Sequence, residues 1–196
     1  MSAILERDPT LPGARRKITR EDCRVLDKAG LLDWERHELI DGYLIRKLPK
    51  SPLDSVALLR LTEWLRGIFG PLHVQQGAAI VVGPDLSATN EPEPDAIVLR
   101  RPVTEFHTEN PGPPDLLLVA EVCSTTQEYA LGAKAALYAS AGIAEYWVLD
   151  LRDMRIFVHR EPMGERYGSI LAYAADEAVA PLAAQSDSIR LCDLVS

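Results

Sequence analysis

The apolar run DLLLVAEVC at residues 115–123 constrains the fold more than any other part of this sequence. It carries hydrophobic side chains on both faces of a strand, which is typical of a strand in the middle of a covered sheet. One acid, Glu121, interrupts the run on the face that also carries Leu117 and Val119. A charged carboxylate is costly to bury unless it is paired or bound to a metal ion. The run therefore predicts a central strand and a buried acid that needs a partner.

Helix and strand patterns follow one another along the rest of the chain. We expect helices at 18–30, 53–69 and 126–142, a hairpin at 37–49 that turns at Asp41-Gly42, and strands at 73–83, 95–100, 144–150 and 154–161. The last thirty residues are alanine-rich and weakly patterned. This order predicts an α/β fold, of the α+β mixed-sheet kind, with a central mixed sheet flanked by helices.

We expect residues 1–17 to be a loose N-terminal arm and residues 18–196 to be a single domain. The arm lacks the apolar core of a signal peptide, and no apolar run approaches the ~20 residues that span a bilayer. The three cysteines are far apart, so they fit neither a disulfide framework nor a zinc site. We therefore expect a protein of the reducing cytoplasm.

The charge balance limits how the chain could bind nucleic acid. A net charge of −8 argues against a protein that coats nucleic acid through bulk charge. However, residues 1–66 carry 13 Lys and Arg against 11 Asp and Glu, whereas residues 67–196 carry 8 against 18. A basic surface in the N-terminal half is thus compatible with the composition, and DNA is permitted as a partner.

Two acids and a lysine are expected to meet at one end of the sheet. Asp95 begins its strand, and Glu121 lies near the end of the next. Lys134 falls within the apolar stripe of its helix, and helical side chains lean toward the helix N-terminus, which aims it at Glu121. Such carboxylates suit a hard cation such as Mg²⁺, which can activate water for phosphodiester hydrolysis.

Each of these residues also has a simpler explanation. Asp95 follows a proline and could serve only a turn. Glu121 could be an acid at a strand end that reaches water, and Lys134 could extend its ammonium past the apolar face. Glu38 could be an ordinary polar strand residue. Taken together, Asp95, Glu121 and Lys134 favour a site over three separate coincidences.

Five segments carry a family resemblance: ELIDG (38–42), PDAIV (94–98), DLLLVAEVCSTT (115–126), LGAKAALYASAGIAEYWVLD (131–150) and RIFVHR (155–160). At these residues the chain resembles the PD-(D/E)XK nuclease superfamily, and most closely its Uma family of restriction endonucleases. The resemblance implies a restriction-endonuclease-like core, Asp95 and Glu121 as Mg²⁺ ligands, and Glu38 as a further acid of the site. We expect that Mn²⁺ can replace Mg²⁺ and that the Val122 carbonyl is an additional metal ligand.

The chain departs from the family pattern at three positions. The superfamily commonly places a lysine two residues after the second acid, where this chain has Cys123. Lys134, which matches the helix-borne lysine of the family, would take that role. The family usually shows a histidine after SP, where this chain has Asp54 nearby, and an acid before the helical lysine, where it has Ala130.

The resulting interpretation is a Mg²⁺-dependent DNA endonuclease. The resemblance also makes a homodimer plausible, because nucleases that cut both strands often pair. Two other functions stay open from the sequence. One is a catalytically weak relative that binds nucleic acid or a protein, and the other is a metal hydrolase of small molecules.

Overall fold

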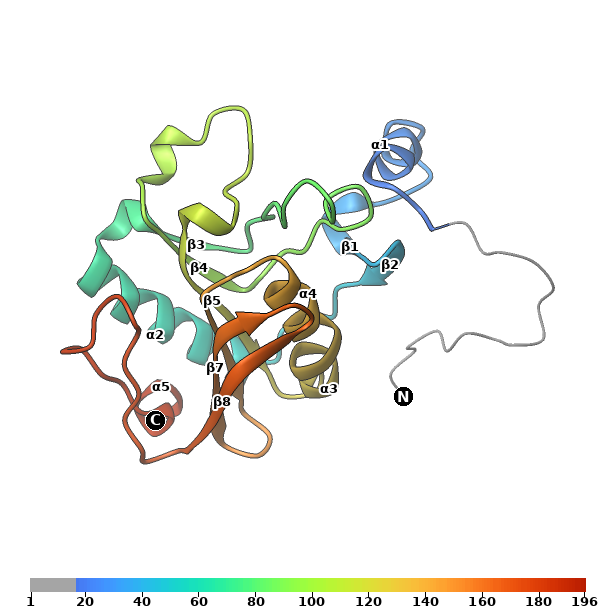
Figure 1. The fold of residues 1–196 in the computed structure, drawn as a ribbon. Helices are drawn as coiled ribbons and strands as arrows, with labels where there is room; N and C mark the ends of the chain where they lie inside the picture. Colours follow the sequence, from blue (N-terminus) through green and yellow to red (C-terminus); the bar gives the residue numbers. More distant parts are fainter. Residues whose placement is uncertain (1–16) are drawn as a thin grey trace.

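The computed structural model describes residues 17–196, and its centre is a six-stranded mixed sheet (Figure 1). The strand order is β3-β4-β5-β6-β7-β8, with β5 parallel to β6 and every other neighbouring pair antiparallel. The strands are β3 (Val74–Gln76), β4 (Ala96–Leu99), β5 (Leu116–Cys123), β6 (Glu145–Asp150), β7 (Arg155–Met163) and β8 (Arg166–Ala174). The predicted mixed sheet is confirmed, and β5 lies inside it as its apolar run requires.

Helices cover both faces of this sheet (Figure 1). On one face lie α2 (Pro52–Phe69) and α5 (Leu191–Val195); on the other lie α3 (Gln127–Tyr129), a π-helical turn (Ala130–Lys134) and α4 (Ala135–Ser140). The α3–α4 segment connects the parallel strands β5 and β6, a connection that requires a crossover. Short 3₁₀ turns occupy Trp34–Arg36, Pro71–His73, Val103–Glu105 and Pro113–Asp115.

No helix within residues 17–196 has both the length and the apolar character needed to cross a membrane. Of the expected N-terminal arm, residues 1–16 lie outside the part of the chain that the structure describes. Lys17, its last residue, forms an ion pair with Asp41.

A separate hairpin brings the N-terminal part of the chain to the sheet. Its strands β1 (His37–Ile40) and β2 (Tyr43–Arg46) pair antiparallel about Asp41 and Gly42, whose φ angles of 49° and 74° define the tight turn that the sequence predicts. Helix α1 (Arg20–Lys28) precedes the hairpin and begins at a Thr19 cap. Leu39 of β1 pairs with Glu91 in the segment that leads into β4. This bridge fixes β1, and with it Glu38, beside the start of β4.

Three differences from the sequence-based expectations concern the sheet. Strand β8 was not predicted, because most of its side chains are exposed and no apolar alternation marks it. The strand expected at 73–83 ends at Gln76, since Gly77 turns the backbone with a φ of 55°. Beside a register shift between Val98 and Leu99, the half-buried Leu117 packs against the core cluster under α2, so Leu117 does not share the face of Glu121.

Candidate active site

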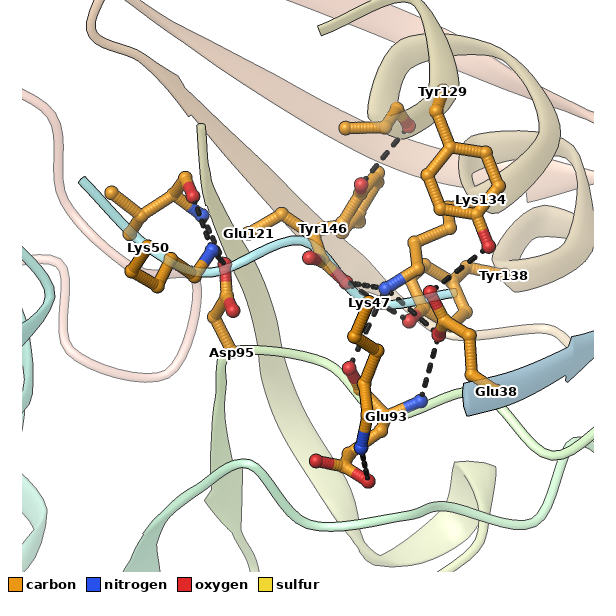
Figure 2. A network of polar contacts seen from close by, with 12 residues as sticks. Glu38, Lys47, Lys50, Glu93, Asp95, Glu121, Tyr129, Lys134, Tyr138 and Tyr146 are labelled. Atoms are coloured by element: carbon orange, nitrogen blue, oxygen red, sulfur yellow. Dashed lines mark hydrogen bonds and ion pairs between the residues drawn. The ribbon is translucent and has the colours of Figure 1, made fainter. Parts of the chain in front are cut away.

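A buried lysine joins the acids that the sequence singled out. Lys134 Nζ lies 2.6 Å from Oε1 of Glu121 on β5 and 3.1 Å from Oε2 of Glu38 on β1 (Figure 2). It also donates to the backbone carbonyl of Glu93 at 3.4 Å. All three charged side chains are buried. The expected approach of Lys134 to Glu121 is therefore confirmed, and the hairpin adds Glu38.

The two glutamates of this cluster differ in how many of their oxygens are used. In Glu38, Oε1 accepts from the Tyr129 hydroxyl at 3.0 Å, and Oε2 accepts from the Glu93 amide at 3.2 Å as well as from Lys134. In Glu121, Oε1 accepts from Lys134 and, at 3.3 Å, from the Tyr138 hydroxyl. No group within residues 17–196 donates to Oε2 of Glu121. Both oxygens of Glu38 accept from the protein, whereas one oxygen of Glu121 has no partner among residues 17–196.

A π-helical turn delivers Lys134 to the cluster. The turn spans Ala130–Lys134, between α3 and α4, and such turns inside helices are frequent at functional sites. The Tyr146 hydroxyl donates to the carbonyl of Ala130 at 3.0 Å, which satisfies a backbone group in the irregular turn. The position where the family usually has an acid, Ala130, is buried against this tyrosine.

Asp95 lies directly before β4 and is held by the neighbouring strand. Its Oδ2 accepts from the Val122 amide at 2.7 Å, which locks the carboxylate beside the residue that follows Glu121. Lys50 then spans the two groups: its ammonium pairs with Oδ2 of Asp95 and donates to the Val122 carbonyl at 2.6 Å (Figure 2). Sequence reasoning missed Lys50, because it belongs to an irregular segment before α2 and no local pattern links it to Asp95. The basic balance of residues 1–66 was the sole hint.

The cluster contains more negatively charged carboxylates than Lys134 alone can neutralise. Burial raises the pKa of Glu121 to about 8 against the opposing effect of Lys134, and the nearby Asp95 and Glu38 charges raise it further. Burial lowers the pKa of Lys134, but Glu121 and Glu38 outweigh it and hold that pKa well above its usual value. Lys134 is thus a permanent cation at neutral pH. A further cation near Glu121 would favour its ionised form.

The structure shows the surroundings of two residues that depart from the family pattern, Cys123 and Asp54. Burial, followed by the charges of Asp150 and Glu121, raises the pKa of the Cys123 thiol to about 12, so this group stays neutral and cannot substitute for a lysine. Asp54 caps α2 through the Ser51 amide and accepts from the Ser124 hydroxyl at 3.0 Å. It ties the start of α2 to the end of β5.

The oxygen atoms around Asp95 and Glu121 fit a hard divalent cation. The ammonium of Lys50 stands on the Asp95 carboxylate and the Val122 carbonyl, which shows that these oxygens accept a positive charge. Within the described chain, Oδ1 of Asp95 and Oε2 of Glu121 have no hydrogen-bond partner. No group of three or more His, Cys, Asp or Glu side chains in residues 17–196 forms a metal cluster. Two carboxylates and a carbonyl nevertheless suit Mg²⁺, which keeps several of its waters.

A mixed sheet between helices, with acids and a lysine gathered at one end, defines the restriction-endonuclease-like class of proteins. The sequence profile of the Uma2 family, described as "Putative restriction endonuclease", matches residues 27–190. The chain therefore belongs to the Uma2 family.

A solved structure shares this fold. It is the crystal structure of a protein described as a "putative nuclease belonging to DUF820" from Anabaena variabilis ATCC 29413, with a TM-score of 0.65 and 17% sequence identity. The match covers 87% of this chain and 96% of that one. No curated protein matches the sequence significantly. The structural likeness supports the fold, and the family supports a nuclease function.

Proposed function

We propose that this protein is a Mg²⁺-dependent endonuclease that hydrolyses phosphodiester bonds in DNA. The observation that carries the proposal is the grouping of Asp95, directly before β4, with Glu121 and the Val122 carbonyl of the adjacent β5, close to a lysine that stays charged. Membership of the Uma2 family supports the same class of reaction.

In this proposal the chain holds the metal and positions the reacting groups. Asp95, Glu121 and the Val122 carbonyl are the protein ligands, and Mn²⁺ can replace Mg²⁺. A divalent cation bound there neutralises charge on the scissile phosphate and acidifies water. Because its pKa is raised, Lys134 acts as a hydrogen-bond donor and a positive charge rather than as a base. All three N–H donors of its ammonium have partners, so Lys134 would exchange its longest contact, at 3.4 Å to the Glu93 carbonyl, for the attacking water. There it would orient the water and offset charge that develops on the phosphorane.

Glu38 has a supporting role in the proposed mechanism. Both of its oxygens already accept from protein groups, and one of these donors is Lys134. Glu38 therefore acts as a positioning residue that fixes the lysine, while the Tyr129 hydroxyl fixes Glu38 in turn. Contact between Glu38 and the metal runs through water at most.

A basic hollow beside the site supports DNA as the substrate. The hollow, of about 460 Å³, is lined by Glu35, Arg36, Arg46, Lys47, Leu48 and Pro49. Lys47 also pairs with Glu93 at 2.8 Å, and the Glu93 carbonyl accepts from Lys134, so the hollow adjoins the acidic cluster. Lys and Arg side chains bind the phosphate backbone without reading its sequence. The acidic net charge of the chain is thus compatible with a local DNA-binding surface.

Cleavage of a supercoiled plasmid tests the proposed function. We expect the parent protein to nick the plasmid with Mg²⁺ or Mn²⁺ and to be inactive in EDTA, and we expect Asp95→Asn and Glu121→Gln to be inactive. Glu128→Gln, which changes an exposed glutamate of α3, is the matched control and should cleave as the parent does. Equal cleavage by Asp95→Asn and the parent would refute the assignment. Salt-dependent DNA binding with no cleavage would instead indicate a binding module.

A further inference from the structure

Lys50 contacts the same two groups that are the proposed metal ligands. Its ammonium pairs with Oδ2 of Asp95 and donates to the Val122 carbonyl at 2.6 Å. These are its hydrogen bonds and ion pairs among the described residues. The side chain of Asp95 is only 15% exposed, so a positive partner offsets the cost of burying its charge. In this state Lys50 stands in for a bound cation.

The two lysines of the site differ in how firmly they are held. Lys134 is 4% exposed, has three oxygen partners and projects from a helical segment packed in the core. Lys50 is 32% exposed and belongs to the irregular segment that joins β2 to α2. Figure 2 shows Lys50 on the Asp95 side of the network, apart from Lys134 and Lys47. A flexible four-carbon stem with access to solvent allows the Lys50 ammonium to leave, whereas Lys134 is fixed.

We propose that Lys50 is an internal cation that occupies the metal position in the metal-free protein and is exchanged for the divalent cation when it binds. This inference rests on the proposed function, because it requires a metal at Asp95 and Val122. A divalent cation and an ammonium cannot share one carboxylate oxygen and one carbonyl, since like charges at contact distance repel strongly. The exchange preserves the neutralisation of Asp95 in both states. It also releases an ammonium beside the reaction centre, where a DNA phosphate would accept it.

Metal affinity of a variant without the ammonium tests the exchange. Lys50→Met keeps the length of the stem and removes the charge, and Lys47→Met, which breaks the ion pair with Glu93, is the matched control. By calorimetry at fixed ionic strength, we expect Lys50→Met to bind Mn²⁺ at least about tenfold more tightly than the parent. Lys47→Met should stay within roughly threefold of the parent, because it leaves Asp95 and Val122 unchanged.

A second measurement uses the parent protein alone and so does not depend on how a variant folds. An amine-reactive reagent read out by mass spectrometry should modify Lys50 slowly in the metal-free protein and faster once Mn²⁺ is bound. Lys28, an exposed lysine at the end of α1, should react equally in both states.

The possible results separate this inference from the proposed function. Equal or weaker Mn²⁺ binding by Lys50→Met than by the parent, or unchanged labelling of Lys50, would overturn the exchange and leave the metal site in place. Absence of Mn²⁺ binding in the parent and in Lys50→Met would overturn both. Tighter binding by Lys50→Met, with metal-dependent labelling of Lys50, would establish the exchange.

Discussion

Two buried glutamates on neighbouring strands, each paired with a basic side chain, are used very differently by this fold. Glu145 of β6 is fully buried, and its Oε1 accepts from the Trp147 indole at 3.0 Å and from Arg160 at 2.6 and 2.9 Å. Its Oε2 accepts from the Leu182 amide at 2.8 Å. Glu121 of β5 accepts through Oε1 alone, and its second oxygen faces the Asp95 side of the network without a partner in residues 17–196 (Figure 2).

The difference shows how a structural ion pair can be told from a functional one. A buried acid whose oxygens are all satisfied serves the packing around it, because nothing is left over for a ligand. A buried acid that keeps a free oxygen, and whose pKa burial raises to about 8, is held ready for another positive charge. Four predictions test this distinction, from the largest expected effect to the smallest.

Removing the charge of Glu121 should abolish catalysis and spare the fold. In Glu121→Gln, Lys134 keeps its partner Glu38, so the protein should remain folded by circular dichroism. The proposed metal, however, loses a ligand. We expect plasmid cleavage to fall by roughly 10³-fold or more. Cleavage within tenfold of the parent would place Glu121 in the same structural class as Glu145.

Truncating Glu145 should have the opposite effect: the protein should lose stability but keep its cleavage activity. Glu145→Ala leaves the Arg160 guanidinium, the Trp147 indole and the Leu182 amide without their shared acceptor. We expect the free energy of unfolding to fall by about 3 kcal/mol in urea denaturation. The fraction that stays folded should cleave DNA at the parental rate. Loss of cleavage without loss of stability would show that Glu145 has a functional role, which would contradict its assignment as a structural residue.

The raised pKa of Glu121 predicts a particular dependence of stability on pH. Its folded pKa of about 8 exceeds the usual value, so the stabilisation from its neutral form is complete in acid and is lost as the pH rises toward 8. Relative to Glu121→Gln, which cannot ionise, the metal-free parent should lose on the order of 3 kcal/mol of unfolding free energy between pH 5 and 8. Parallel stability curves for the two proteins would contradict the raised pKa.

The smallest loss of stability and activity is expected at Tyr129, which hydrogen-bonds Glu38 and, among the described residues, makes no hydrogen bond to the proposed metal ligands. Tyr129→Phe removes one hydrogen bond, at 3.0 Å, and leaves Glu38 with Lys134 and the Glu93 amide. We expect a loss of about 1 kcal/mol in unfolding free energy and a modest fall in kcat with little change in KM. An inactive but stable Tyr129→Phe would mean that the hydroxyl itself takes part in the reaction.

Periodicity and side-chain direction were enough to predict much of this molecule. The apolar run 115–123 and the helical stripe of Lys134 indicated both the central strand and the approach of Lys134 to Glu121, because these follow from local geometry. The π-helical turn, the edge strand β8 and the contact of Lys50 with Asp95 were not predicted. Each depends on the tertiary path of the chain: which loop passes the site, and which strand closes the sheet.

Titration of Mn²⁺ into the metal-free protein at pH 8 tests the central claim most directly, because about half of Glu121 is already ionised there and a bound cation favours the ionised form. The parent, Glu128→Gln and Lys50→Met should each bind Mn²⁺, with Lys50→Met the tightest. Glu121→Gln should bind at least about tenfold more weakly than the parent, as expected for a lost charged ligand. Equal binding by Glu121→Gln and the parent would show that the free oxygen of Glu121 holds no metal, and the proposed site would be wrong.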